Sequence, residues 1–274
     1  MKGYHAKQAS LGPWRFTHAT PRFRDRLDTI FSGYQNFSSW FDLHVEIIKQ
    51  DTYSEVGFAE TLALGRVYVK RYRAKTWLHR VGIFHGRSRA ARCFDNNTAL
   101  LENAIPVPNP YCVVIEKDSL GFPLQSYYLC QGLVSAPDFK SVFLNRAEYS
   151  YGDGSEKFGN IGKQLALLHN AGYMHGDFKW SNVLLLGVQV FFVDLDNVKT
   201  VPESSMAGAR DVARFILNAE DLAIDKTEIN YFLEAYRTNR TASLDNFSDA
   251  VATNLKKLRR RHRVRYGGRA KSIF

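Results

Sequence analysis

The stretch GYMHGDFKWSNVLLL, which begins at Gly172, carries the side chains best suited to chemistry. It places four polar residues between two apolar segments: His175, Asp177, Lys179 and Asn182. Strand interiors disfavour aspartate and lysine, so the polar part is predicted to be a loop between a helix and a strand. Such a loop is either an ordinary polar connection or a functional site.

Transfer of a phosphoryl group needs this combination of side chains. A carboxylate orients the acceptor hydroxyl, a cation balances the transferred group, and metal ligands hold Mg²⁺ against the phosphates. Asp177 is the candidate carboxylate, and Lys179, two residues later, is the candidate cation. Asn182 follows Asp177 by five residues, which is the spacing of the protein-kinase catalytic loop. Asn182 is therefore a candidate metal ligand, with a plain Asx turn as the alternative.

Two other segments supply the remaining parts. The apolar segment FFVDLDN ends in Asp194 and Asp196, and such a pair is costly unless a metal or another partner neutralises it. Asp194 is predicted to bind Mg²⁺, whereas Asp196 binds a second metal ion or caps the following turn. The segment VYVK places Lys70 at the end of a hairpin strand, where it is predicted to hold nucleotide phosphates rather than to be a surface lysine.

Supporting residues are also predicted near this loop. His175 is expected to brace the loop through the backbone around Asp194 rather than to transfer a proton, and His169 is expected to pack in the core. An ion-pair set at i, i+3 and i+4 spacing is expected to brace the loop from a later helix, through Arg210, Asp211 and Arg214.

The segments HGDFKWSN, VDLD and VYVK together resemble the protein-kinase-like superfamily. More narrowly, they resemble the bacterial lipopolysaccharide core kinases, which phosphorylate heptose or Kdo. The narrower resemblance also rests on the basic stretch after Lys70, on SRAARCFDNNTALLENAIPVPNP, on LHNAGYMHGDFKWSNVLL and on ARDVARFIL. It covers roughly residues 55–240.

The resemblance implies ATP and Mg²⁺ as cofactors and a lipopolysaccharide core glycolipid as acceptor. It implies a cytoplasmic enzyme, peripheral on the inner face of the cytoplasmic membrane. Asp177 and Lys179 would be catalytic, Lys70, Asn182 and Asp194 would bind the nucleotide, and Asn182, Asp194 and Asp196 would hold metal. Two other functions remain open: a protein or other small-molecule kinase of the same fold, and a pseudokinase that binds an anionic partner.

The sequence departs from the kinase pattern at three places. A Gly-rich phosphate loop is missing, so the phosphate cover is expected to be a plain turn around Glu60. The acid that pairs with Lys70 is Asp95 or Glu102, and both stay open. Gly176 replaces the arginine that many protein kinases use to read a phosphorylated activation loop, which favours an enzyme that is always active.

The order of elements predicts an α+β, bilobal protein-kinase-like fold. Strands are expected in VGFAETLAL, VYVKRY, YCVVIEKD and QSYYLCQGL, with one main helix from about Ser88 to Asn103, and mostly helices follow. The expected domains are a flank packing on the N-lobe (1–50), an N-lobe (51–133) and a C-lobe with a basic C-terminal helix (134–274). In the flank, a helix is predicted near Phe37–Ile48.

The net charge of +10 at pH 7 indicates an anionic partner. Its densest source is KKLRRRHRVR, residues 256–265, which is predicted to bind an anionic membrane surface, with no nucleic acid expected. No segment approaches the roughly 20 apolar residues that span a bilayer, and no secretory signal is expected at the N-terminus. The three scattered cysteines fit a reducing compartment.

Overall fold

The computed structural model describes most of the chain, namely residues 10–11, 14–74, 88–149, 154–202 and 206–266. Internal contacts divide the chain into two compact units. The first is Met1–Ala99 with Pro108–Val134, and the second is Leu100–Val107 with Ser135–Phe274. The expected division into 1–50, 51–133 and 134–274 stays a prediction.

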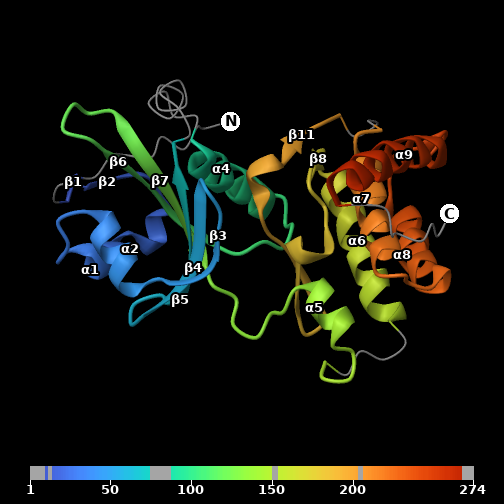
Figure 1. The fold of residues 1–274 in the computed structure, drawn as a ribbon, viewed down its shortest axis with the longest axis horizontal. Helices are drawn as coiled ribbons and strands as arrows, with labels where there is room; N and C mark the ends of the chain where they lie inside the picture. The colour runs from blue at the N-terminus through green and yellow to red at the C-terminus, as the bar shows by residue number, and fades with distance from the viewer. Residues whose placement is uncertain (1–9, 12–13, 75–87, 150–153, 203–205, 267–274) are drawn as a thin grey trace. The chain divides into compact units, whose positions relative to one another are not determined.

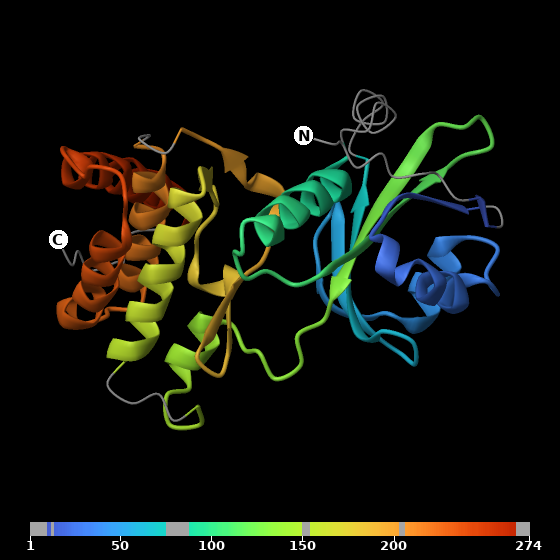
Figure 2. The ribbon, with the colours of Figure 1, turned by 180° about the vertical axis from the view of Figure 1, so that it is seen from behind.

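The first unit is built on a seven-stranded antiparallel sheet with the order β1-β2-β6-β7-β5-β4-β3. Its strands are β1 (Ser10–Leu11), β2 (Trp14–Ala19), β3 (Glu46–Gln50), β4 (Ser54–Thr61), β5 (Gly65–Arg73), β6 (Pro110–Lys117) and β7 (Pro123–Gln131). The helical segments are η1 (Pro21–Phe23), α1 (Arg24–Phe31), α2 (Phe37–His44) and α4 (Arg89–Glu102). Helices α1 and α2 lie on one face of the sheet and α4 lies on the other (Figures 1 and 2).

Strand β5 shows how alternation assigns side chains to these two faces. Val67 and Val69 are fully buried among the residues of α1 and α2. Tyr72, which has the opposite parity, belongs to the cluster that α4 covers. Lys70 shares that parity, so the strand places it on the α4 side of the sheet.

The N-terminal part differs from the predicted helix near Phe37–Ile48. Helix α2 begins at its cap Asn36, whose side chain accepts the N–H of Ser39, and ends at His44. The chain then becomes extended, and Glu46–Gln50 pairs with β4 as an edge strand. The β-branched residues at 47 and 48 suit a strand, and this preference outweighs the amphipathic pattern.

The second unit is mostly helical. Its helices are α5 (Phe139–Leu144), α6 (Ser155–Asn170), α7 (Gly208–Asp221), α8 (Lys226–Asn239) and α9 (Phe247–Tyr266), with the 3₁₀ turns η2 (Trp180–Asn182) and η3 (Leu195–Asn197). Two antiparallel strand pairs complete it: β8 (Tyr173–Met174) with β11 (Lys199–Thr200), and β9 (Val183–Leu186) with β10 (Gln189–Phe192). Helix α6 packs against α8, and α7 packs against α9.

Close approach of α6 and α8 depends on one glycine. A Cβ at Gly162 would lie 2.2 Å from the carbonyl oxygen of Phe232, so only glycine lets the two backbones meet there. The large cluster around them contains Phe178, Trp180 and Phe215, all fully buried. The polar loop that begins at His175 is therefore built on a rigid apolar base.

The arrangement confirms the α+β class predicted from the sequence. A sheet with one long helix on its second face forms the first unit, and packed helices form most of the second. Within the part of the chain that the structure describes, no helix is long and apolar enough to cross a membrane.

Candidate active site

The polar loop runs from the end of β8 to the start of β9 and closes on itself through Asn182. The Nδ2 group of Asn182 donates to the carbonyl oxygen of Asp177 at 3.0 Å, and its backbone N–H donates to the carbonyl oxygen of Lys179 at 2.8 Å. Only 5% of Asn182 is exposed. The loop thus has a fixed shape, with Asn182 as its internal support.

Asp177 lies between two cations. Its Oδ2 is 3.1 Å from Nζ of Lys179, and its Oδ1 is 3.4 Å from a terminal guanidinium nitrogen of Arg214. The three side chains are 26%, 29% and 31% exposed, respectively. The structure therefore brings Asp177, Lys179 and Asn182 together as predicted, and adds an arginine from α7.

Asp211 of α7 holds the start of this loop. Its two carboxylate oxygens accept the backbone N–H groups of His175 at 2.7 Å and Gly176 at 2.9 Å. His169 donates from Nε2 to the same carboxylate at 3.3 Å and accepts the Tyr236 hydroxyl at Nδ1, 2.7 Å away. The carboxylate is 1% exposed, and hydrogen bonds to such a charged group are strong.

This arrangement corrects the predicted ion-pair set on α7. Asp211 does brace the loop, but through backbone amides and His169 rather than through Arg210 or Arg214. Arg214 instead contacts Asp177. His169 is buried in the core as predicted, and its second role as a hydrogen-bond donor follows from its place beside Asp211.

His175 ties the loop to the end of β10. Its Nε2–H donates to the carbonyl oxygen of Val193 at 3.1 Å, and its Nδ1 faces the backbone N–H of Asp177 at 3.4 Å. The ring is fully buried. Both ring nitrogens are engaged with backbone atoms, which agrees with the predicted bracing role next to Asp194 and leaves no nitrogen for proton transfer.

Gly176 has a structural reason of its own. Its φ is +80°, and a Cβ there would lie 2.5 Å from the carbonyl oxygen of Asn197. An arginine at this position would carry both the conformational cost and the clash. The backbone geometry therefore explains why the kinase arginine is replaced here.

Asp194 and Asp196 lie just past the end of β10. The backbone N–H of Val193 donates to the carbonyl oxygen of Asn182 at 3.1 Å, so Asp194 immediately follows a direct contact with the loop. Asp194 has φ +63°, a left-handed conformation that is uncommon outside glycine and frequent at functional positions. Asp196 is 7% exposed in η3, and its Oδ1 accepts the side chain of Asn197 at 3.2 Å.

Replacing Asp211 by alanine is expected to lower the free energy of unfolding by about 3 kcal/mol. The change leaves one buried and one partly buried N–H group without their acceptor and removes charge-assisted bonds, each worth about 1.5–3 kcal/mol. Chemical denaturation measures the effect, with Arg210→Ala on the same helix as control because Arg210 is exposed. Equal stability of the Asp211 variant and the control would contradict the bracing role.

Lys70 belongs to the sheet unit, where it is 8% exposed. It pairs in register with Val56 and Tyr128, and its Nζ lies 5.2 Å from the centre of the Tyr72 ring. Its proposed role on nucleotide phosphates, together with the loop residues, stays a prediction.

Helix α4 presents an arginine and uncharged polar groups, rather than a carboxylate, to the sheet, and the Arg89 guanidinium lies 4.7 Å from the centre of the Tyr72 ring. The Tyr72 hydroxyl lies 3.3 Å from Sγ of Cys93, and Asn97 donates to the Tyr128 hydroxyl. Asp95 and Glu102 are both exposed and lie about half a turn from Cys93 on the helix. Partial burial raises the pKa of Asp95. Asp95 therefore occupies the face of α4 away from the sheet, and the identity of the acid that pairs with Lys70 stays a prediction.

The expected turn around Glu60 lies elsewhere. Glu60 is within β4, where its carboxylate pairs with Arg66 of β5 at 2.5 Å. The hairpin turn comprises Leu62–Leu64 and is closed by Thr61, whose hydroxyl donates to the Gly65 carbonyl oxygen. The strand pairing continues through Glu60 and so displaces the turn toward Gly65.

The comparisons with known proteins agree with this architecture. The family model described as "Lipopolysaccharide kinase (Kdo/WaaP) family" matches residues 46–236, which is more than half of the chain. A comparison with curated proteins found no match. A solved structure described as "WaaP in complex with acyl carrier protein" is similar with a TM-score of 0.57 at 14% identity, covering 88% of this chain and 96% of that one.

The structural likeness confirms the predicted bilobal kinase-like fold, and the family match covers both the sheet strands from β3 onward and the polar loop. The chain belongs to the lipopolysaccharide kinase (Kdo/WaaP) family, whose members are phosphotransferases that act on sugar hydroxyls.

Proposed function

We propose that this protein transfers the terminal phosphoryl group of ATP, in the presence of Mg²⁺, to a heptose or Kdo hydroxyl of the lipopolysaccharide inner core. The observation that carries the proposal is the construction of the polar loop. Asn182 and the Asp211 brace hold a partly exposed carboxylate, Asp177, directly beside Lys179. Phosphoryl transfer depends mainly on such positioning and charge balance.

In the proposed reaction, Asp177 accepts a hydrogen bond from the acceptor hydroxyl and orients its oxygen toward the terminal phosphorus. The bond from that phosphorus to the bridging oxygen of ATP breaks, a bond to the sugar oxygen forms, and ADP leaves. The hydroxyl proton passes to Asp177. Lys179, already within 3.1 Å of that carboxylate, offsets the negative charge on the transferred group.

The donor set suits magnesium. Asn182 uses Nδ2 in its bond to Asp177, so its Oδ1 lies on the other branch of the amide, and Asp194 supplies a carboxylate one residue after the strand contact with Asn182. Mg²⁺ prefers oxygen ligands and is commonly bound by one or two protein groups together with phosphates, whose charge it offsets.

In this proposal Asp194 and Asn182 hold the metal ion, and Lys70 holds nucleotide phosphates. Asp196 supports the η3 turn, because its carboxylate is buried and bonded to Asn197. The wild-type protein is therefore expected to transfer a labelled terminal phosphoryl group from ATP to dephosphorylated lipopolysaccharide only when Mg²⁺ is present. The proposal would be overturned if the glycolipid became labelled equally after chelation of divalent ions, or if it never became labelled.

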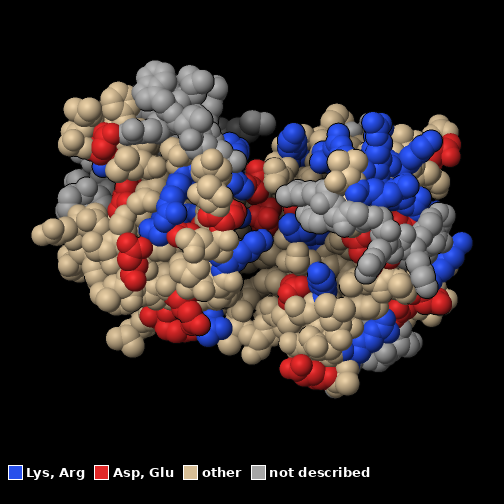
Figure 3. Space-filling model, in the orientation of Figure 1, with Lys and Arg blue, Asp and Glu red and all other residues tan. Residues whose placement is uncertain are grey.

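We further propose that α9 holds the enzyme on the anionic cytoplasmic face of the inner membrane. One side of α9 is attached to α7, through buried Leu255 and through the ion pair of Arg259 with Glu220. The opposite side carries exposed basic residues, and Lys and Arg side chains gather over this helix (Figure 3).

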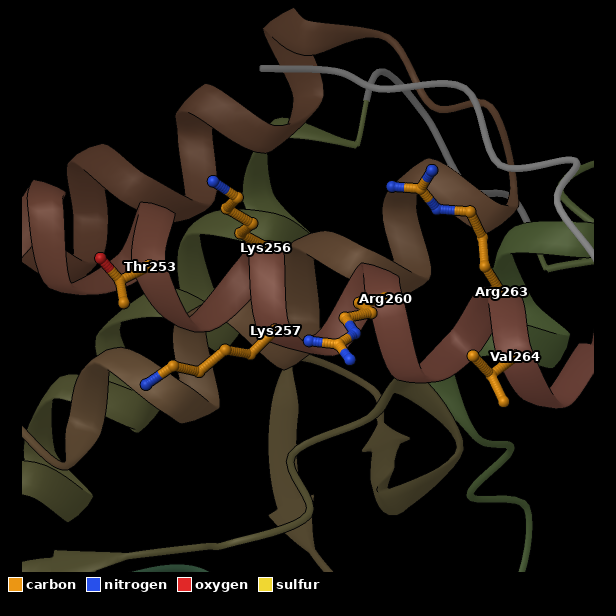
Figure 4. Close-up of a pocket in the computed structure, with 6 residues that line it drawn as sticks. All are labelled: Thr253, Lys256, Lys257, Arg260, Arg263 and Val264. Carbon is orange, nitrogen blue, oxygen red and sulfur yellow. The ribbon is translucent and has the colours of Figure 1, made fainter.

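Four of these basic residues recur at helical spacing and, together with a threonine and a valine, line an open hollow of about 690 Å³. Figure 4 shows the lining residues on successive turns of α9: Thr253, Lys256, Lys257, Arg260, Arg263 and Val264. Basic residues at a membrane surface contribute about 1 kcal/mol each toward anionic lipid. A lipid-linked acceptor would then be met at the surface where it resides.

Reversing three charges, Lys256→Glu, Lys257→Glu and Arg260→Glu, is expected to weaken binding to phosphatidylglycerol-containing liposomes by roughly 100-fold or more. A matched triple reversal on exposed residues of other helices, at Lys140, Lys163 and Arg237, should change it much less. Co-sedimentation at two salt concentrations measures both. Equal losses in the two triple variants would reduce the effect to net charge and reject the α9 surface.

A further inference from the structure

Arg214 contacts the catalytic carboxylate of the loop, and the proposed transfer gives it no role. It comes from α7, and a terminal nitrogen of its guanidinium lies 3.4 Å from Oδ1 of Asp177, whereas Lys179 occupies Oδ2. The contact is single and long, and not the two-bond fork that arginine forms with a carboxylate at full strength. Its buried Nε has no hydrogen-bond partner among the described residues. Arg214 thus contacts Asp177 through one terminal nitrogen, and most of its N–H donors are not used in that contact.

Asp221, the neighbouring carboxylate on α7, forms its close contact with His262 rather than with Arg214. Asp221 is close enough to Arg214 for an electrostatic interaction, but its Oδ2 lies 3.4 Å from Nε2 of His262 on α9. Partial burial raises the pKa of Asp221, and His262 opposes that rise more than Arg214 does. Asp221 is therefore oriented toward α9, and Arg214 keeps its direction toward Asp177.

The charged groups around Asp177 are only loosely paired. One carboxylate, Asp177, faces two cations, and all three side chains are about one-quarter to one-third exposed. When Lys179 serves the transferred phosphoryl group, Asp177 is the carboxylate that Arg214 contacts, and that contact is a single one at 3.4 Å. The terminal nitrogens of the guanidinium therefore keep donors that an anionic group on the acceptor, next to the reacting hydroxyl, would engage.

We propose that Arg214 is a specificity residue that binds a carboxylate or phosphate carried by the acceptor sugar beside its reacting hydroxyl. The inference rests on the proposed function, because Asp177 must be the residue that receives the hydroxyl. A guanidinium suits this task because its planar fork matches both anions in two-bond geometry. Arg214 would thus select the acceptor molecule, while Asp177 acts on its hydroxyl.

The test measures binding separately from transfer. The probe is a deacylated inner-core oligosaccharide that retains its Kdo carboxylates and its phosphates. It is compared with the same oligosaccharide after carboxyl reduction and after phosphatase treatment, which distinguishes the two sources of negative charge. Titration calorimetry gives the dissociation constants for the wild type, Arg214→Gln, Arg214→Lys and the control Arg210→Gln. The control removes an exposed positive charge from the same helix, one turn away.

Arg214→Gln is expected to weaken binding of the intact probe by about 10- to 100-fold, and Arg214→Lys by less, because a charge-assisted pair of bonds is lost. The treatment that removes the recognised anion should weaken wild-type binding by the same factor and leave the glutamine variant unchanged. In the transfer assay, Arg214→Gln should raise the KM for the acceptor and leave the KM for ATP as it is.

Equal binding of the intact probe by the wild type and Arg214→Gln would overturn the inference, whether or not phosphate is transferred. Losses as large in Arg210→Gln would also overturn it, because they would show an effect of overall charge. A wild-type protein that binds the probe through Arg214 but transfers no phosphate would instead reject the proposed function and leave the anion site standing.

Discussion

Replacing Asp177 by asparagine is expected to lower kcat for phosphoryl transfer by about 10²- to 10⁴-fold. Proton acceptance and orientation by a placed carboxylate contribute that range, and the amide keeps the size of the side chain but not its charge. The KM for ATP should change little, because Asp177 contacts Lys179 and Arg214 and is not a proposed nucleotide ligand. Initial rates with purified protein, ATP and acceptor glycolipid measure both constants.

The same substitution is expected to leave the fold intact. Lys179 and Arg214 are 29% and 31% exposed, and exposed ion pairs contribute only about 0–1 kcal/mol. Asp249→Asn, an exposed aspartate at the start of α9, serves as the control for loss of one carboxylate. An Asp177 variant that keeps a tenth or more of the wild-type kcat would show that another group orients the hydroxyl.

Replacing Asp194 by asparagine is expected to abolish most Mg²⁺-dependent ATP binding and to lower activity by at least about 100-fold. The removed charge is the carboxylate proposed to face the metal ion, which relies on charged oxygen ligands. Asparagine tolerates the left-handed backbone at φ +63° better than alanine does, so the variant tests the ligand rather than the backbone. Calorimetric titration of ATP with and without Mg²⁺ measures the loss.

Asp196→Asn is the matched comparison, two residues along the same turn. Its carboxylate is buried against Asn197, so the variant is expected to lose stability and to keep its Mg²⁺ dependence. The reverse pattern, with Mg²⁺-dependent binding lost in the Asp196 variant and kept in the Asp194 variant, would show that Asp196 rather than Asp194 holds the metal ion.

Local spacing was sufficient to predict the centre of the candidate site. Asp177, Lys179 and Asn182 belong to one short loop, and the hydrogen bond from Asn182 back to Asp177 follows from their separation of five residues. The bracing role of His175 was also predictable, because it acts on the backbone of the next apolar strand. Such contacts depend on few residues and on one hairpin.

The supporting contacts were harder to predict because they cross the helical unit. Asp211 binds two backbone N–H groups 35 and 36 residues earlier, and backbone groups leave no signature in side-chain patterns. Arg214 was expected to pair along its own helix, but packing directs it to Asp177 instead. The spacing from Asp211 to Arg214 is one helical turn, which is the only signal in the sequence that both reach the same loop.

The class of the fold and most of its sheet were predicted, whereas the edge strand β3 was not. Strands β4 to β7 and α4 follow clear periodic patterns, whereas β3 was read as the end of a helix. A helix cap and an edge strand meet at Val45, and only pairing with β4 decides between them. The same limit applies to α4, where helix rotation places Cys93 rather than Asp95 against the sheet.

The central claim is that the loop around Asp177 phosphorylates a sugar of the lipopolysaccharide core. Mass spectrometry of inner-core oligosaccharide, released after incubation of dephosphorylated lipopolysaccharide with ATP, Mg²⁺ and protein, tests it most directly. The account predicts one added phosphate on heptose or Kdo with the wild type, and none with Asp177→Asn. A core sugar that gains no phosphate from the wild-type protein, or gains it equally from the Asp177 variant, would contradict the account.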